Sequence, residues 1–473
     1  MFLCAVLLFV NLYSISTLTT KPAYWYDDGI NVELAHNFAD FGQLDLIVAP
    51  NIFSGAGATV GSTGYPITIP LAGFFKAFGF GLAQARIYML LWMNAFLLFF
   101  FFIVKKIWDS RMAYMGTLLI ASFAPFYGNG RSVMGEIPGF LFFLSSFYFL
   151  EQRKWWQSGL LLGLAVVSKP SIFVFLIPAY VLTLLFSNGT WQSKFFNLLK
   201  LGGSSFLALL LWLIIYIEEV SRGGLGENIL NHFKNPYAEA GVRALTNIGN
   251  NLPTLATSTT LLYMWVLLLG VVVALYIERG LLRDHKNLLI FSAVYIPLAL
   301  LQYLKSFGYL RYLIATEFLI FILFLLALPA LARFALRKAS FLGSAQKVMI
   351  TTVTLLVLMQ TVHLFAFSDL YSSEKTQKTI LYVFTHYPEG TIGVINIPQV
   401  ASFIPSFQKY QYLSTYGLWD FGTHMLYLTP ERLPATLILE SEDTLSADER
   451  GVLASRYQKD ESFTEGFLVY RRK

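Results

Sequence analysis

The sequence predicts an α-helical polytopic membrane protein with a small C-terminal α/β domain. Of the 473 residues, 56% are hydrophobic and only 13% are charged, about half the charged share of an ordinary soluble domain. The apolar residues form a series of runs, several of them long enough to cross a bilayer. Lys and Arg concentrate in short loops between these runs. We therefore attribute the net charge of +6 to basic residues that orient the chain in the membrane, and we expect no nucleic-acid partner.

Eleven apolar runs are candidate membrane spans. They lie near residues 2–20, 84–104, 112–130, 133–150, 158–169, 171–186, 201–217, 260–277, 288–304, 312–332 and 348–366. The first run has no basic segment before it, which favours a span over a cleaved signal peptide. The two runs that meet at Lys169-Pro170 are either two spans or one broken helix. Cys4 is the only cysteine, so no disulfide framework is possible.

The distribution of basic residues predicts the orientation of the chain. The loops predicted to be cytoplasmic are 105–111, 151–157, 187–200, 278–287 and 333–347. They hold 14 Lys and Arg in 53 residues, whereas the two long loops on the other side, 21–64 and 218–259, hold four in 86 residues. Because Lys and Arg favour short cytoplasmic loops, the first long loop is expected outside the cytoplasm. Residues 65–80 are short and interrupted by proline, and we predict a juxtamembrane helix there.

The hydrophobic pattern changes after Phe367. Helical patterns near 374–386 and 446–456 alternate with strand-like runs at 391–397, 436–439 and 467–470. We therefore divide the chain into a transmembrane module, residues 1–366, and an extracytoplasmic α/β domain, residues 367–473. The second part is long enough to fold on its own.

Two adjacent carboxylates, Asp27 and Asp28, stand out in the first long loop. They follow three aromatic residues and precede a helical pattern that ends at Gly42. We expect this helix to pack its apolar face on the membrane surface. One aspartate could simply be its N-cap. Alternatively, a carboxylate held ionised by the helix N-terminus can accept a proton from an acceptor hydroxyl or bind a hard divalent cation.

Six cations lie where spans meet the outer surface, against the usual bias. They are Lys76, Arg86, Arg131, Lys169, Lys305 and Arg311. Each side chain alone could reach the interface with its charged group while its aliphatic part lies against apolar surface. Together they indicate an anionic ligand, and a lipid phosphate fits best because Arg binds it with two N–H groups and Lys as a point charge. Arg131, Lys169 and the pair Arg311-Tyr312 are the predicted phosphate-binding residues.

Two further residues are weaker candidates. Glu136 begins an apolar helix, where a carboxylate needs a partner. It either forms a salt bridge with Arg131 or faces the first loop as a second acidic ligand, in which case Asp28 and Glu136 would hold a metal ion. His232 lies in the second long loop and is a possible acceptor or metal contact, although a lone loop histidine usually has no such role.

The order of these motifs resembles a known family. The resemblance rests on Tyr26-Asp27-Asp28-Gly29, residues 33–37 with Gly42, Gly64-Tyr65-Pro66, residues 75–79, Ala85-Arg86, the run 159–165 leading into Ser168-Lys169-Pro170, and Arg311-Tyr312. It covers residues 1 to about 335 of the sequence. These segments resemble the bacterial relatives of protein O-mannosyltransferases and of the lipid A aminoarabinose transferase, which are membrane-embedded glycosyltransferases of the GT-C class.

The resemblance implies a GT-C-like fold and transfer of a sugar from a polyprenyl-phosphate donor to a glycan, lipid or protein acceptor. Asp27 falls on the family's invariant acid, and Asp28 on a position that is Glu or Asp in relatives. The implied enzyme lies in the bacterial plasma membrane among membrane lipids, and its active site and C-terminal domain face the periplasm or exterior. The transfer would be assisted by a base or a divalent metal. Gly64-Tyr65-Pro66 departs from the aminoarabinose transferase, which has Glu-Lys-Pro there, so that enzyme's metal site is not carried over.

Two other functions share some of these features. A transporter or flippase of lipid-linked sugars would also need many spans and phosphate-binding cations, but its charges usually lie near the midplane and in matching halves. A polymerase or ligase of surface polysaccharide would use the same donors. It would be expected to have a large late outer loop, whereas here the first loop carries the candidate residues.

Overall fold

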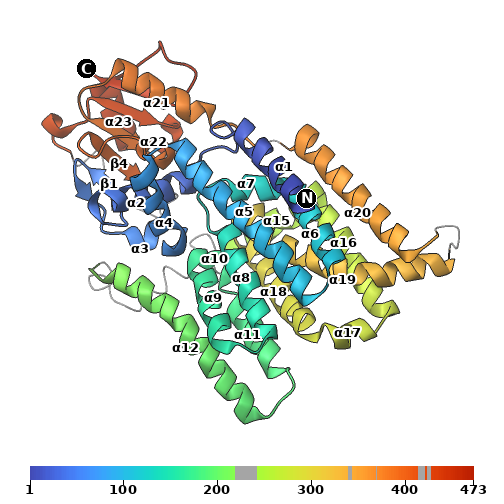
Figure 1. The fold of residues 1–473 in the computed structure, drawn as a ribbon. Coiled ribbons are helices and arrows are strands. Elements are labelled where there is room, and N and C mark those ends of the chain that lie inside the picture. The colour runs from blue at the N-terminus through green and yellow to red at the C-terminus, as the bar shows by residue number, and fades with distance from the viewer. Residues whose placement is uncertain (219–241, 339–342, 369, 414–420, 423–427) are drawn as a thin grey trace.

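A helical bundle and a smaller sheet domain make up the computed structural model (Figure 1), which describes residues 1–218, 242–338, 343–368, 370–413, 421–422 and 428–473. The helices of the bundle are α1 (Phe2–Ser16), α5 (Leu82–Ile107), α6 (Ser110–Ala121), α7 (Ala124–Gly130), α8 (Glu136–Glu151), α9 (Trp155–Ser168), α10 (Pro170–Phe173), α11 (Leu176–Leu185), α12 (Trp191–Ile215), α15 (Val242–Thr257), α16 (Thr259–Ile277), α17 (Gly280–Asp284), α18 (Lys286–Lys305), α19 (Ile314–Lys338) and α20 (Ala345–Val362). The predicted polytopic helical fold is confirmed.

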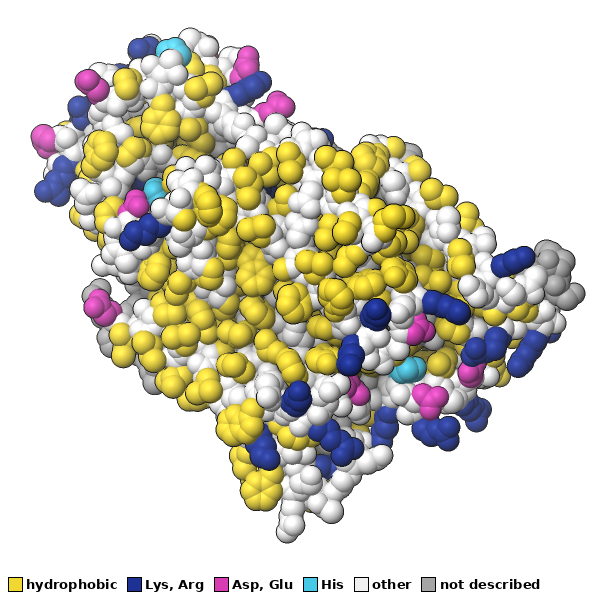
Figure 2. Space-filling view, in the orientation of Figure 1, with side chains coloured by type: hydrophobic (Ala, Val, Ile, Leu, Met, Phe, Trp, Pro, Cys, Tyr) yellow, Lys and Arg dark blue, Asp and Glu magenta, His cyan; other side chains and the backbone are white. Residues whose placement is uncertain are grey.

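Six of the described helical segments are long and apolar enough to cross a membrane. They are Leu82–Ile107, Trp191–Ile215, Thr259–Ile277, Lys286–Lys305, Leu310–Lys338 and Ala345–Ala366. Shorter apolar helices coincide with three of the five other predicted spans, near residues 2–20, 158–169 and 171–186. The remaining two, near 112–130 and 133–150, coincide with α6 and α7 and with α8. Large apolar side chains such as Phe206 on α12 and Leu269 on α16 are exposed, and yellow apolar atoms cover much of the bundle in Figure 2. Such extensive apolar exposure is expected of a surface that contacts lipid.

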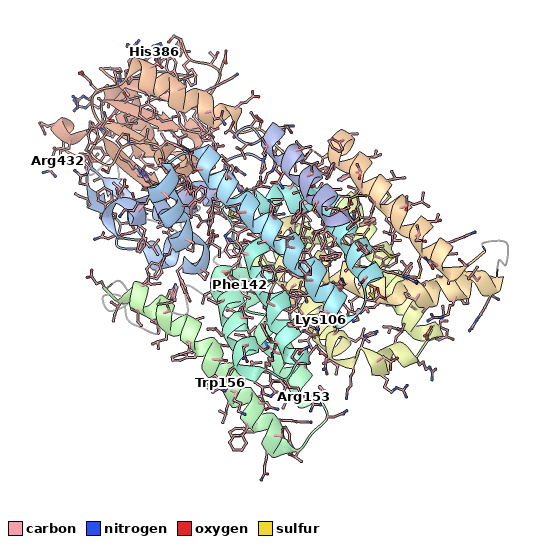
Figure 3. All side chains as sticks on the ribbon, in the orientation of Figure 1. Lys106, Phe142, Arg153, Trp156, His386 and Arg432 are labelled. Atoms are coloured by element: carbon pink, nitrogen blue, oxygen red, sulfur yellow. The ribbon has the colours of Figure 1, made fainter. Side chains whose placement is uncertain are left out.

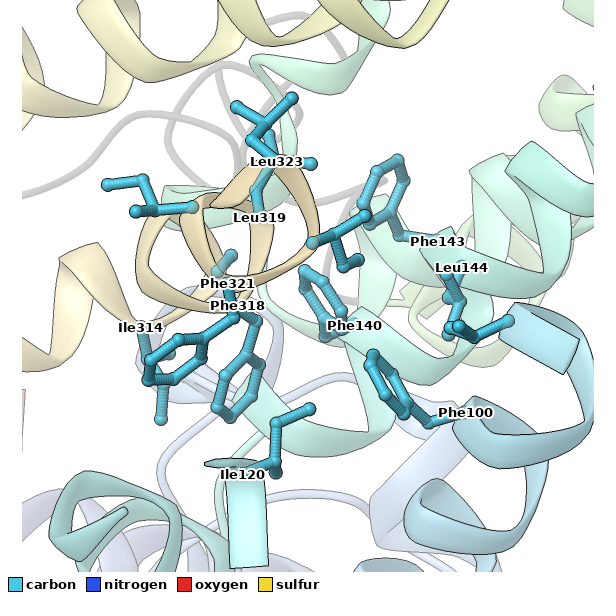
Figure 4. Close-up of a cluster of buried hydrophobic side chains, with 14 of the residues drawn as sticks. Phe100, Ile120, Phe140, Phe143, Leu144, Ile314, Phe318, Leu319, Phe321 and Leu323 are labelled. Atoms are coloured by element: carbon cyan, nitrogen blue, oxygen red, sulfur yellow. The ribbon is translucent and has the colours of Figure 1, made fainter. Parts of the chain in front are cut away.

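The core of the bundle is aromatic and centres on α8 and α19. Phe140 of α8 and Phe318 of α19 are fully buried, and their ring centroids are 5.1 Å apart. Phe100 and Ile120 bring α5 and α6 to the same cluster (Figure 4). Because α19 is buried along nearly its whole length, it is the central helix around which the others pack.

The chain reverses direction at Lys169. Helix α9 ends at Ser168 and α10 begins at Pro170, as expected from the effect of proline on helices. Trp155 at the start of α9 and Leu184 at the end of α11 line the same cavity. The two predicted runs are therefore antiparallel segments, and the alternative of one broken helix is wrong. Lys169 lies at the turn between them.

The C-terminal part contains a mixed six-stranded sheet of strand order β5-β4-β3-β6-β8-β7. Its elements are α21 (Glu374–His386), β3 (Ile392–Ile395), α22 (Pro398–Ala401), β4 (Lys409–Leu413), β5 (Phe421–Gly422), β6 (Thr436–Leu439), α23 (Ala447–Arg456), β7 (Tyr457–Lys459) and β8 (Leu468–Arg472). Strands β4, β3 and β6 are parallel, and the other pairings are antiparallel. The predicted helices and strands are present, and β4, β5 and β7 are additional.

The first long loop folds into α2 (Tyr26–Phe41), β1 (Ile47–Ala49), β2 (Ile52–Phe53) and α3 (Gly57–Val60), and α4 (Tyr65–Phe78) follows it. Helix α2 ends at Gly42, whose φ of 73° suits glycine. Helix α2 packs between α4 and α22, and residues 27–35 are all buried. The expectation that α2 lies on the membrane surface is therefore wrong, because protein covers both of its faces.

Candidate active site

Helix α2 presents both aspartates in its first turn. The N-cap residue is Trp25, which has an extended backbone and forms no side-chain capping bond. Asp27 and Asp28 are therefore inside the helix, and the N-cap alternative is wrong. The positive end of the helix dipole favours carboxylates at these positions. Both side chains are at most 5% exposed, so their partners decide what each can do.

Asp28 connects three segments of the chain through hydrogen bonds. Its Oδ2 accepts a hydrogen bond from Nη2 of Arg86 on α5 at 2.9 Å, and its Oδ1 accepts one from the backbone N–H of Val133 at 2.7 Å. Arg86 also donates to the backbone oxygens of Pro22 and Ala23. These bonds use both oxygens of Asp28, and they hold α2 against α5 and the segment before α8.

Asp27 pairs with Arg311 at the start of the segment that leads into α19. Nη2 of Arg311 donates to Oδ2 of Asp27 at 2.5 Å. The guanidinium carbon of Arg311 lies 4.4 Å from the ring centroid of Trp25 and 5.5 Å from that of Tyr312. Cation–π contacts of this kind hold the planar group in one orientation. Tyr312 therefore contacts Arg311, and its predicted contact with the donor phosphate stays a prediction.

Glu136 and Lys169 complete a group of four charges. Both side chains are buried and interact electrostatically with each other and with Arg311. Nζ of Lys169 lies 4.0 Å from the sulfur of Met134, and Nη1 of Arg311 lies 3.8 Å from the same atom. We call Asp27, Glu136, Lys169 and Arg311 the charge cluster. Its members come from α2, α8, the turn at Lys169 and the start of the α19 segment.

The charge cluster has unused hydrogen-bonding capacity. Both carboxylate oxygens of Glu136 and the Nε of Arg311 are buried. None of the three has a hydrogen-bond partner within the described ranges. Oδ1 of Asn31, on the same helix as Asp27, is also buried without a hydrogen-bond partner among the described residues. Buried polar atoms without partners are rare in proteins and are common at functional sites.

The two aspartates have pKa values shifted in opposite directions. Burial raises the pKa of Asp27, but the charges of Arg311 and Lys169 outweigh it, so the pKa is lowered. Burial raises the pKa of Asp28 by more than Arg86 and the Val133 N–H lower it. Opposite shifts in neighbouring acids indicate different roles. Of the two aspartates, Asp27 is the one whose ionised form is favoured by its surroundings.

Arg131 contacts a different part of the protein. It donates to the backbone oxygen of Ser14 at 3.2 Å and to Oγ1 of Thr17 at 2.6 Å, and its guanidinium lies over Tyr13. Among the residues described, it forms no ion pair with Glu136. Its Nε and Nη2 are buried and have no hydrogen-bond partner in the described part of the chain, and its predicted contact with a donor phosphate stays a prediction. His232 lies outside the described residues.

The C-terminal domain covers the back of α2. Nζ of Lys409 on β4 lies 2.8 Å from Oε1 of Glu33, and both side chains are buried. The Tyr24 hydroxyl is 2.9 Å from Oγ of Ser402. A Cβ atom on Gly29 would lie 2.4 Å from the backbone nitrogen of Gln399, so only glycine fits there. This domain therefore buttresses the helix that carries Asp27.

The residues present do not by themselves form a metal site. No group of three or more His, Cys, Asp or Glu side chains in the described segments could hold an ion. Asp28, predicted to share a metal with Glu136, already binds Arg86 and a backbone N–H.

Comparisons with known proteins identify the fold of the chain. Residues 68–216 match the family model of dolichyl-phosphate-mannose-protein mannosyltransferases, and no curated protein is significantly similar in sequence. ArnT from Cupriavidus metallidurans bound to undecaprenyl phosphate superimposes with a TM-score of 0.58 at 14% identity, covering 99% of this chain and 97% of ArnT. The chain has a GT-C fold. The predicted resemblance to the O-mannosyltransferase and aminoarabinose transferase class is confirmed.

More distant GT-C proteins share the same architecture. The archaeal oligosaccharyltransferase AglB from Archaeoglobus fulgidus, in complex with an inhibitory peptide and a dolichol-phosphate, has a TM-score of 0.55 at 12% identity. The match covers 93% of this chain and 69% of AglB. An oligosaccharyltransferase structure from the same organism in complex with Zn and sulfate has a TM-score of 0.51 at 14% identity, covering 99% and 73%.

Sequence reasoning missed three residues that shape this site. Arg86 was noted only as a cation at the span edge, although it is the partner of Asp28. Met134 has no charge to attract notice, yet Lys169 and Arg311 meet at its sulfur. Lys409 is 376 positions from Glu33, and a contact so distant in sequence leaves no local pattern.

Proposed function

We propose that this protein transfers a sugar from a polyprenyl-phosphate donor to an acceptor on the extracytoplasmic face of the membrane. The observation that carries the proposal is the charge cluster, in which the carboxylate of Asp27 faces two buried cations. ArnT and AglB, whose fold this chain shares, were solved with undecaprenyl phosphate and dolichol-phosphate respectively. Two cations can bind the phosphate of such a donor, and the carboxylate beside them can accept the proton of the acceptor.

Lys169 and Arg311 are proposed to bind the donor phosphate. The phosphodiester of the donor carries one negative charge, and the released polyprenyl phosphate carries a second when fully ionised. Buried cations stabilise charge that develops during reaction more strongly than solvated ones do. Burial lowers the pKa of Lys169, and the nearby Glu136, whose carboxylate has no hydrogen-bond partner among the described residues, opposes that effect.

Asp27 is proposed to be the general base. The acceptor oxygen attacks the anomeric carbon, the bond from that carbon to the phosphate oxygen breaks, and the acceptor proton moves to Asp27. The carboxylate loses one negative charge as the phosphate gains one, so the net charge of the cluster is unchanged. Binding of the phosphate also offsets the positive charges of Arg311 and Lys169, which stabilise the ionised form of Asp27. The pKa of Asp27 then rises, which makes it a stronger base when the donor is present.

The alternative functions make different demands on the charges. A flippase would move the phosphate through the bundle, which requires polar groups along its length. The charge cluster instead lies beside the first loop and next to the C-terminal domain. A polymerase or ligase would use a similar lipid-linked donor, but it would move an oligosaccharide or polymer in place of one sugar.

A metal-assisted transfer is the alternative mechanism. The Zn found in the archaeal oligosaccharyltransferase complex makes this comparison relevant. Here it would need a ligand in addition to Asp27 and Glu136. A chelator such as EDTA would then abolish activity, and added divalent metal would restore it. The proposed side-chain mechanism predicts activity that EDTA leaves unchanged.

Analysis of cell-envelope molecules tests the proposed function. Surface lipids, polysaccharides and glycoproteins are compared by mass spectrometry in cells with the gene, without it, and with Asp27→Asn in its place. We expect one hexose- or pentose-sized group to be missing in the second and third strains. A whole missing polymer would identify a polymerase or ligase. Normal glycosylation in all three strains would contradict the proposal.

A further inference from the structure

A cavity of about 630 Å³ lies at the end of the bundle away from the C-terminal domain. We call it the inner-end pocket. Figure 3 shows Arg153, which lines it, at the opposite end of the molecule from His386 of the C-terminal domain. Its lining comes from four connections, represented by Trp108, Arg153, Lys194 and Lys286. Each belongs to a different loop that the charge pattern predicts to be cytoplasmic.

Basic groups outnumber acidic ones in the lining. The basic residues are Arg153, Lys194, Arg283 and Lys286, and the acidic residues are Glu151 and Asp284. Both acids already have partners, because Glu151 accepts a hydrogen bond from Asn287 at 3.0 Å and Asp284 lies 3.5 Å from Arg283. Neither Arg153 nor Lys286 is within 4 Å of an acidic group in the described part of the chain. The pocket therefore has a net positive charge that its own residues leave uncompensated.

Aromatic side chains place the pocket at the depth of lipid headgroups. Trp155 lines it, and Trp156 and Trp191, from two of the same connections, are 56% and 73% exposed. Tryptophan favours the membrane–water interface, where one edge of the ring is apolar and the other is hydrated. Phe195 and Phe196 at the start of α12 are also exposed, so apolar surface continues from the pocket rim toward the bilayer.

We propose that the inner-end pocket binds a phosphate group, and that an anionic phospholipid of the leaflet opposite the charge cluster supplies it. Arg153 offers the planar N–H donors that suit a phosphate, and Lys286 adds a mobile point charge. Basic pockets between membrane helices bind lipid headgroups on this principle. The site is separate from the proposed donor site because the two lie at opposite ends of the bundle.

Lipid retention by the full-length protein tests the proposal. The protein is purified in detergent, mixed with cardiolipin, phosphatidylglycerol or phosphatidylcholine, and examined by native mass spectrometry. We expect the first two lipids to be retained and phosphatidylcholine to be lost. The double variant Arg153→Gln/Lys286→Gln should weaken retention about 25-fold, since each cation that faces an anionic headgroup contributes about fivefold.

A matched control removes the same charge elsewhere. Arg337 and Lys338 are exposed in the last turn of α19 and do not line the pocket. The variant Arg337→Gln/Lys338→Gln should retain anionic lipid like the wild type. Thermal unfolding of both double variants verifies that each is folded. Equal retention by all three proteins, or equal losses in the two variants, would overturn the proposal.

Competition identifies the source of the phosphate. Excess inorganic phosphate should leave the anionic lipid bound, because the lipid also gains from contacts of its chains with the apolar rim. That result supports a headgroup site. If inorganic phosphate displaces the lipid, and its binding also depends on Arg153 and Lys286, the phosphate site stands but its ligand is a soluble compound.

Discussion

At the scale of single residues, Asp27 and Asp28 are adjacent but differ in their partners. Asp27 meets Arg311 inside the charge cluster, whereas Asp28 is enclosed by Arg86 and the Val133 N–H. Asp27→Asn keeps the size of the side chain and removes the base. We expect turnover to fall by about 10²–10⁴-fold, measured with purified enzyme and a polyprenyl-phosphate sugar. Nearly normal turnover would show that Asp27 is structural.

The matching substitution Asp28→Asn should act on folding. It leaves the buried guanidinium of Arg86 without its carboxylate, and such a loss typically costs about 3–5 kcal/mol. Thermal unfolding in detergent should therefore show a clearly lower Tm for Asp28→Asn than for Asp40→Asn, since Asp40 is more than half exposed. If Asp28→Asn unfolds at the wild-type temperature, Asp28 does not stabilise the fold by connecting these segments.

The two cations of the charge cluster give a separate prediction. Arg311→Ala and Lys169→Ala should each weaken donor binding by about 2–5 kcal/mol, because the phosphate would lose a buried charge partner. Lys76→Ala is the control, since Lys76 is an exposed cation in the last turn of α4. Arg311→Ala also removes a main cause of the lowered pKa of Asp27. The acid limb of the kcat/KM profile should then move to higher pH. Wild-type binding in both variants would contradict the assignment.

At the scale of elements, the contact between α2 and the sheet domain gives a further prediction. Lys409→Met leaves Glu33 buried and charged, so Tm should fall and KM or kcat should change because α2 carries Asp27. Adding Glu33→Gln removes the unpaired charge and should restore much of the stability. Lys378→Met removes the exposed pair with Glu465 and serves as the control. Equal Tm values for Lys409→Met and Lys378→Met would argue against buttressing.

Local patterns predicted the elements well, and distant contacts explain what they missed. Apolar runs mark the spans because backbone groups in lipid must bond within a helix, and Gly42 ends α2 where the pattern predicts. Ile30 and Leu34 were assigned to the membrane surface because apolar spacing shows that a face is buried but not what buries it. The pairing of Asp27 with Arg311 joins residues 284 positions apart. The sequence indicates that each is unusual, but only the fold brings them together.

At the scale of the whole molecule, we expect the two ends of the bundle to lie on opposite sides of the membrane. The sheet domain lies at one end of the molecule, and Lys and Arg side chains of the bundle gather at the other (Figure 2). A reporter active only outside the cytoplasm should be active when fused after Phe367 and inactive after Lys154. Charge asymmetry predicts this orientation because basic loops resist translocation. The reverse pattern would place Asp27 and its acceptor on the cytoplasmic side, and it would contradict transfer on the extracytoplasmic face. Activity at both positions would contradict the placement of the two ends on opposite sides, since residues 154 and 367 would then share one side.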